Sequence, residues 1–305
     1  MIVTEEKEYN ARFDFLCERK LKAADPALHE RFRSSVFSMD RLLANYKNIF
    51  PFFTNHTFEH SEQVINYCNV IAGDEIIGEL NPDELYILLM GAALHDVGMG
   101  ISESDFRDLC GNVPPLVAFM KEHPNELLGE YTRLFHQELS AEFVIKYRRL
   151  FDIPTEAHLH CIAQITRGHR ESDLFDLTKF PTDYPMPNGN KVNLAYLASL
   201  VKIADELDVA SDRNLLFNYN DVNKAWSEKQ TMCYKCHGAI KRLGVREDSL
   251  VLYYETSDEA VENEILETKE KVETTFAEYQ AVTKQRTNYM NRIRAVEFEN
   301  LINKN

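Results

Sequence analysis

The stretch that organises this chain reads Leu88-Leu-Met-Gly-Ala-Ala-Leu-His-Asp-Val-Gly-Met-Gly100. Its apolar run predicts a buried helix, and the glycines that follow His95 and Asp96 predict that the helix ends there. Adjacent helical residues point about 100° apart, so His95 and Asp96 can bind one ion only where the helix ends or bends. Read alone, the pair also fits a buried His-Asp hydrogen bond in a core helix.

Further histidines and a further aspartate share this chemistry elsewhere in the chain. Neutral imidazoles and carboxylates are ligands of divalent transition metals, which polarise phosphoryl oxygens and generate hydroxide from water at neutral pH. We therefore predict a metal centre and, as the first hypothesis, phosphoester hydrolysis. The predicted metal ligands are His60, His95, Asp96, His136, His169 and Asp205.

Two histidines at the start of another helix, His56 and His60, are predicted to have different roles. His56 and His60 lie four residues apart, so on a helix they share one face. His60 lies just inside an apolar helix and is the predicted ligand, whereas His56 lies where that helix starts and is predicted to contact substrate. A helix-capping pair is the alternative interpretation.

Two other histidines are predicted at helix ends. His136 opens a helix with a polar first turn and His169 closes another, which predicts that they hold a second metal. Histidines at helix ends also serve as caps, so both interpretations stay open.

Asp205 interrupts an apolar helix on the side that the pattern predicts to be buried. A buried carboxylate is costly unless it is compensated, and a metal would compensate it. Asp208 and Asp212 share that face and are predicted to support the ligands. Lys202 and Arg213 are available for phosphate. The alternative is an ordinary amphipathic helix with solvated acids.

Composition narrows the class of protein. The 305 residues include 44% apolar and 27% charged residues, enough for a large globular core, and the net charge is -15. No run of basic residues is present, so duplex nucleic acid is not an expected partner. The first residues do not follow the order of a signal peptide, and no stretch approaches about 20 apolar residues, which predicts a cytoplasmic protein without membrane contact.

Helical spacing dominates the chain and predicts an all-α bundle. A loop rich in proline is expected at 180–190, where it would form a rim beside the centre. Five helices are predicted, at about 57–80, 83–96, 135–150, 155–168 and 192–212.

The pattern changes after residue 230. Residues 239–255 predict a small β-hairpin, and about 258–302 predict a long C-terminal helix that packs on the bundle or on a partner, which would allow homo-oligomers. We therefore divide the chain into a helical lead-in at 1–50, a ligand-bearing domain at 51–228, and a hairpin with a long helix packed on the core at 229–305.

At these residues the sequence resembles the HD-domain metal-dependent phosphohydrolase superfamily, which is named for its paired His-Asp. The resemblance covers about residues 50–215 and implies an HD-domain helical bundle. In binuclear members Asp96 would bridge to a second metal held by His136 and His169, and a bridging hydroxide would attack phosphorus in line. The resemblance implies a first metal held by His60, His95, Asp96 and Asp205.

The resemblance also assigns catalytic and substrate roles. Arg167 and Arg170 would orient the phosphate together with His56, and the sequence pattern around Asp205 adds Arg213 as a further phosphate-binding residue. Lys202 would support Asp205 in catalysis. The predicted catalytic residues are thus Asp96, His56, Lys202 and Arg170, and the predicted substrate-binding residues are Arg167, Arg170, Arg213 and His56.

Departures from one branch of the superfamily bear on the substrate. The cyclic-di-nucleotide phosphodiesterases have a lysine where this chain has Met99 and paired histidines where it has His169-Arg170, so we do not assign that substrate. The segments 53–61 and 200–208 look more like the HD modules found with Hsp90-like ATPases and bacterial conflict systems.

The sequence therefore predicts hydrolysis of a nucleotide or related small phosphoester through a metal-activated hydroxide. One or two divalent ions are expected, with Mn or Fe favoured and Zn, Ni, Co or Mg open. One alternative is a non-catalytic HD module that senses nucleotides or acts as a scaffold. Another is a deoxynucleotide triphosphohydrolase with a single metal, so the number of bound ions discriminates between the readings.

Overall fold

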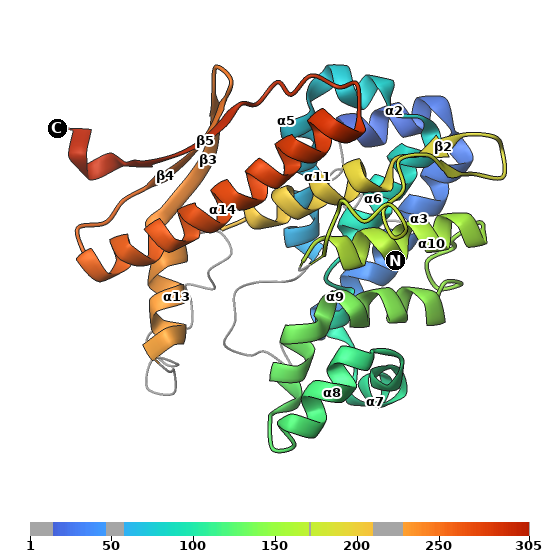
Figure 1. The fold of residues 1–305 in the computed structure, drawn as a ribbon, viewed down its shortest axis with the longest axis horizontal. Coiled ribbons are helices and arrows are strands. Elements are labelled where there is room, and N and C mark those ends of the chain that lie inside the picture. Colours follow the sequence, from blue (N-terminus) through green and yellow to red (C-terminus); the bar gives the residue numbers. More distant parts are fainter. Residues whose placement is uncertain (1–14, 47–57, 171, 210–227, 305) are drawn as a thin grey trace, which may run out of the picture.

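The computed structural model describes residues 15–46, 58–170, 172–209 and 228–304. It shows an all-α bundle with a small sheet and a long helix on its C-terminal side (Figure 1), which confirms the predicted fold class. In the described part of the predicted helical lead-in, α2 spans Leu16–Ala24 and α3 spans Pro26–Ala44. Both helices pack against α6, the helix that carries the His-Asp pair.

Helix α5 spans Phe58–Glu79 and is the predicted helix at 57–80. Gly73 breaks it with a φ of 71°, a left-handed conformation that glycine adopts without steric cost. His60 lies in the first turn of this helix, and α5 packs on α6 and α11.

Three helices of equal length form the centre of the bundle. Helices α6 (Pro82–Leu94), α10 (Glu156–Gly168) and α11 (Leu194–Glu206) each have 13 residues and pack against one another. Every residue of α6 after Pro82 is buried, as its apolar run predicts. Side chains immediately before each helix cap the starts of all three, namely Asn81, Thr155 and Asn193.

The region between α6 and α10 differs from the prediction. After the 3-10 turn η1 (Val97–Gly100), the chain forms α7 (Glu103–Leu109), η2 (Cys110–Asn112) and α8 (Pro114–Glu122), which were not predicted. Helix α9 spans Leu128–Lys146 and so starts before the predicted 135. A break at Phe135 (φ -123°, ψ 18°) divides α9, so His136 begins the second half of α9, close to the predicted start at 135, and does not open the whole helix.

The proline-rich loop lies away from the His-Asp pair. It forms a short hairpin of β1 (Tyr184–Pro185) and β2 (Lys191–Val192). Asn188 and Asn190 in this hairpin donate to Asp83 in the first turn of α6. The hairpin is therefore not a rim beside the centre, because about 18 Å of helix separates the start of α6 from His95. The first residue of the loop, Phe180, lies instead against Gly168, next to His169.

The C-terminal region contains the predicted hairpin and long helix, with one strand more. Helix α13 (Glu228–Ala239) leads into β3 (Ile240–Arg246), which pairs antiparallel with β4 (Ser249–Tyr254). Helix α14 runs over Glu259–Arg286 and packs on α11 of the bundle (Figure 1).

The predicted helix at 258–302 starts correctly but ends too late. After α14, strand β5 (Ala295–Asn300) pairs in parallel with β4, and a 3-10 turn, η5 (Leu301–Lys304), follows. Residues 296–299 alternate between apolar and polar side chains, which suits a strand better than a helix. The division of the chain into three segments stays a prediction.

Among the described residues, no single helix has the length and apolar composition of a membrane span. One pair of segments, Pro82–Gly100 and Glu103–Asn112, meets those two criteria together but is bent by 107°.

Candidate metal centre

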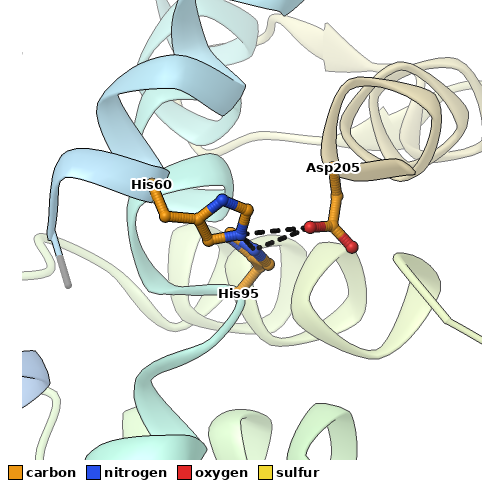
Figure 2. A group of neighbouring side chains, drawn as sticks. All are labelled: His60, His95 and Asp205. Carbon is orange, nitrogen blue, oxygen red and sulfur yellow. Dashed lines mark hydrogen bonds and ion pairs between the residues drawn. The ribbon is translucent and has the colours of Figure 1, made fainter. Parts of the chain in front are cut away.

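Three predicted ligands from distant parts of the chain form a first cluster (Figure 2). His60 comes from the start of α5, His95 from the C-terminal end of α6 and Asp205 from the last turn of α11. The Nε2 atoms of His60 and His95 are 3.1 Å apart. The Oδ1 atom of Asp205 lies 3.1 Å from the Nε2 atom of His60 and 3.6 Å from the Nε2 atom of His95.

The other three predicted ligands form a second cluster beside the first. The Nε2 atoms of His136 and His169 are 3.1 Å apart. The Oδ1 atom of Asp96 lies 3.3 Å from the first of these nitrogens and 3.6 Å from the second. All three side chains are buried.

Asp96 joins the two clusters through its two oxygens. While Oδ1 faces the second cluster, Oδ2 lies 3.5 Å from the Nε2 atoms of both His60 and His95. The local backbone explains this position. His95 caps α6 in a helical conformation, and Asp96 then leaves the helix with φ -104° and ψ 8°. The predicted end of the helix at the His-Asp pair is confirmed.

Gly98 brings the second cluster against this turn. A Cβ atom on Gly98 would lie 2.6 Å from the carbonyl oxygen of His136 and 2.8 Å from the hydroxyl of Ser140. In the structure, the Gly98 amide donates to that hydroxyl at 2.8 Å. The absence of a side chain at residue 98 therefore lets α9 approach Asp96 closely enough for His136 to reach it.

Hydrogen bonds fix which nitrogen of each imidazole faces the cluster. The Nδ1 atoms of His95, His136 and His169 each lie 2.6 to 2.7 Å from the backbone carbonyl oxygen three residues earlier. A carbonyl only accepts, so these nitrogens carry the proton. When neutral, the three rings therefore present an Nε2 lone pair to the cluster. Such orientation is typical of metal-ligating histidines.

His60 is oriented in the same sense by a carboxylate. Its Nδ1 atom lies 2.5 Å from Oδ2 of the buried Asp208. The predicted support of the ligands by Asp208 thus has a structural basis. When the Nδ1 atom of neutral His60 donates this hydrogen bond to the carboxylate, its Nε2 atom carries a lone pair toward the cluster.

The electrostatics of the second cluster favour neutral imidazoles and an ionised carboxylate. Burial lowers the pKa of His136 to about 4 and lowers the pKa of His169 as well. Burial alone would raise the pKa of Asp96, but the neighbouring histidines hold it well below its usual value. The pKa of Asp205 is held low in the same way by His60 and His95.

These protonation states make the centre a good fit for cations. Two neutral imidazoles that face each other with lone pairs at 3.1 Å repel, because neither has a proton to donate, and a shared cation removes the repulsion. Two atoms about 2.1 Å from one ion, at angles of about 90 to 110°, are about 3.0 to 3.4 Å apart. The separations of 3.1 to 3.6 Å within each cluster are close to this range. The buried cluster can therefore hold a divalent metal.

The bundle adds a further favourable field. His95 and His169 cap the C-terminal ends of α6 and α10, and Asp205 lies in the last turn of α11. The carbonyl-rich end of a helix carries partial negative charge, so three such ends that converge on one place favour a cation there.

A comparison with known protein families assigns the chain to one of them. The sequence profile of the HD-CE family matches residues 50–282, most of the chain. The chain belongs to the HD-CE family. A search of curated proteins finds no match. The predicted resemblance to HD domains is thereby confirmed at the level of an HD-type domain that carries a candidate metal site, which is consistent with a metal-dependent hydrolase.

The predicted substrate residues of this HD-CE chain lie in different surroundings. Arg167 donates to Glu138 at 2.9 Å and to Glu142 at 2.8 Å on α9, so its guanidinium links two helices of the bundle. Arg170 follows His169 directly, and its guanidinium lies 3.9 Å from Glu206. Their substrate roles stay predictions.

Lys202 does not pair with Asp205 as expected. Its ammonium group donates to Glu278 on α14 at 2.7 Å, which couples α11 to the C-terminal helix. The structure therefore does not show the expected contact between Lys202 and Asp205. His56, Asp212 and Arg213 lie outside the described residues.

Sequence reasoning missed Ser140 and the three backbone carbonyls that orient the histidines. The carbonyls leave no signal in the side-chain pattern. Ser140 lies four residues after His136, on the same face of α9, and this spacing is the one signal that could have marked it.

Proposed function

We propose that this HD-CE protein is a metal-dependent phosphohydrolase or phosphodiesterase that acts on a nucleotide or a related small phosphoester. One observation carries the proposal. Asp96 directs one carboxylate oxygen toward each of two pairs of histidines, so a single residue can bridge two ions. Divalent ions held in this way would polarise a phosphoryl oxygen and supply a nucleophile from water at neutral pH.

The chain's own groups would prepare the centre for this chemistry. The carboxylates of Asp96 and Asp205 stay ionised, since their pKa values are held low. The imidazoles keep their lone pairs directed inward through hydrogen bonds on the opposite nitrogen. Mn or Fe would suit the mixed nitrogen and oxygen donors, with Zn, Ni, Co and Mg as alternatives.

Arg170 is the described cation that we propose for orienting phosphate. Its side chain is 37% exposed, and its positive charge contributes to lowering the pKa of His136, which places it near the second cluster. Contact between Arg167 and a substrate would require that arginine to leave Glu138 and Glu142, so we rank it below Arg170.

A second candidate function is a non-catalytic module that binds a nucleotide. The presence of all six candidate ligands in two clusters favours turnover over this reading. The position of Asp96 between the clusters favours two ions, and so a phosphodiesterase-like centre, over a single-metal deoxynucleotide triphosphohydrolase.

The proposal is tested by turnover in the presence of Mn²⁺. Purified protein is incubated with bis-p-nitrophenyl phosphate, nucleoside monophosphates and deoxynucleoside triphosphates, and the products are separated by chromatography. Release of phosphate or of a monoester, lost in Asp96→Ala and retained in the exposed Asp108→Ala, would support it. Release of inorganic triphosphate would favour the triphosphohydrolase, and nucleotide binding without product would favour the module.

A further inference from the structure

Three helices carry four of the six candidate ligands. The C-terminal ends of these helices lie close together, and so do their N-terminal ends. Helices α6, α10 and α11 have the same length, and each carries its ligands at or just beyond its C-terminal end. Their N-terminal ends also meet, around two adjacent acidic residues, Asp83 and Glu84, in the first turn of α6. We call these two residues the acidic hub.

Asp83 links α10 and the β1–β2 hairpin to α6. Its Oδ1 atom accepts from His158 Nε2 at 2.9 Å, and its Oδ2 atom accepts from Asn188 at 2.8 Å and from Asn190 at 2.6 Å. The carboxylate is almost fully buried, with 1% of the residue exposed. The other nitrogen of His158 lies 2.8 Å from Thr155, the residue that caps α10.

Glu84 links α11 to the same place. Its Oε1 atom accepts from the backbone amide of Asn193, the residue that caps α11, at 3.1 Å. Its Oε2 atom accepts from the backbone amide of Asn81 at 3.1 Å. The start of each of the three helices is therefore tied to one dipeptide by directional hydrogen bonds.

We propose that Asp83 is a positioning residue for the metal centre, which sets the relative heights of α6 and α10 so that their far ends bring His95, Asp96 and His169 together. The inference rests on the metal centre of the proposed function. A well-packed helix transmits an axial shift along its length, because its side chains interlock with those of its neighbours. Ligand distances tolerate errors of only about 0.2 Å, so a small shift at the hub would disturb metal binding about 18 Å away.

The competing reading is that the hub only stabilises the fold. Glu18 offers a matched control, because it is also a buried carboxylate that pairs with a buried histidine, His29, at 3.0 Å. This pair joins α2 to α3, neither of which carries a candidate ligand. A purely structural role predicts similar consequences for Asp83→Asn and Glu18→Gln.

The experiment measures Co²⁺ binding by the visible absorption of the metal, whose intensity and position depend on coordination geometry. Wild-type protein, Asp83→Asn and Glu18→Gln are titrated with Co²⁺, and their thermal unfolding is recorded without metal. His158→Gln, which keeps a donor for Asp83, is compared with His158→Leu, which does not, so that the test survives if Asp83→Asn fails to fold.

We expect Asp83→Asn and His158→Leu to bind Co²⁺ at least about tenfold more weakly and with an altered spectrum. Glu18→Gln and His158→Gln should bind within about twofold of wild type, whatever their change in melting temperature. Wild-type spectra and affinities in both Asp83→Asn and His158→Leu would overturn the inference, as would equal losses in Glu18→Gln. If wild type binds Co²⁺ and Asp83→Asn does not, but no phosphoester is cleaved, only the proposed function fails. A wild-type protein that takes up no Co²⁺ would overturn both.

Discussion

The two clusters of the metal centre hold their histidines by different means. In the first, Asp208 accepts a hydrogen bond from His60, whereas His95 donates to a backbone carbonyl, and the ligands come from three helices that pack on one another. In the second, His136 and His169 donate to backbone carbonyls alone, and the first of these follows a break in α9. A carboxylate partner makes an imidazole a stronger ligand than a neutral carbonyl does.

Because the two clusters differ in this way, we expect them to bind their ions with different affinities. One histidine of the first cluster has a carboxylate partner, Asp208, so we expect this cluster to bind its ion more tightly. The second depends on the close approach of α9 to Gly98, a contact that one methyl group would obstruct. We therefore expect the second ion to be the one that is lost first.

The most damaging change should be Asp96→Ala, because Asp96 is the one candidate ligand among the described residues whose two oxygens face different clusters. We expect turnover to fall by at least about 10³-fold and the bound metal to fall to one ion or none. Circular dichroism checks that the helices remain. Activity retained within tenfold of wild type would contradict a shared role for Asp96.

Gly98→Ala should weaken metal binding at the second cluster more than at the first. The added Cβ would overlap with the backbone of α9, so we expect a loss of about 1 to 3 kcal/mol in the free energy of unfolding and a preferential loss of the second ion. Gly111→Ala is the matched control, because a Cβ there meets no atom within 4 Å. Urea unfolding and metal analysis of both variants measure the two effects. Loss of the first ion alone would contradict the comparison.

Asp208→Asn should weaken the first cluster selectively. The amide can still accept from His60, but its lack of charge makes the imidazole a poorer ligand. We expect the affinity for the first ion to fall by about 10-fold to 100-fold while the second is unchanged. A two-step metal titration by calorimetry resolves the two sites, and an unchanged first step would count against the role of Asp208.

The smallest effect concerns acid stability and lies at the hub, away from both clusters. Burial would raise the pKa of Asp83, but hydrogen bonds from His158, Asn188 and Asn190 outweigh it and lower that pKa. A carboxylate with a lowered folded pKa stabilises the fold above its unfolded pKa of about 3.9, and this contribution is lost as the pH falls through the folded value.

The unfolding free energy of metal-free wild type should therefore decline below about pH 4 more steeply than that of Asp83→Asn. Urea unfolding between about pH 2 and pH 6 measures both slopes. Parallel slopes would show that Asp83 has the same pKa in the folded and unfolded chains.

The sequence predicted well those features that depend on residues close together in the chain, and it predicted poorly those that depend on distant segments. Asn81 and Thr155 mark the starts of α6 and α10 correctly, because helix capping involves residues three positions apart. The end of α6 at His95 and Asp96 was also predictable from the glycines that follow. In contrast, we predicted helix over β5, because its alternating pattern at 296–299 is short and its pairing partner β4 lies on the other side of α14 in the sequence.

The same distinction applies to the metal centre. Residue type and predicted position at helix ends or on a buried face together singled out the six candidate ligands. The structure brings them into two adjacent groups, although their role as ligands stays a prediction. Their grouping around Asp96, the contact of Gly98 with Ser140 and the hub at Asp83 depend on the approach of segments far apart in the chain. No spacing in the sequence encodes such distances.

The two-ion metal centre can be tested by the number of metal ions bound per chain, measured by plasma mass spectrometry on protein purified without chelators. Wild type is compared with His136→Ala and His60→Ala. We predict two ions in wild type, about one in His136→Ala, and a weaker remaining site in His60→Ala than in His136→Ala. One ion in wild type that is unaffected by His136→Ala would contradict the shared two-ion centre, and no ion after resupply would contradict a metal centre altogether.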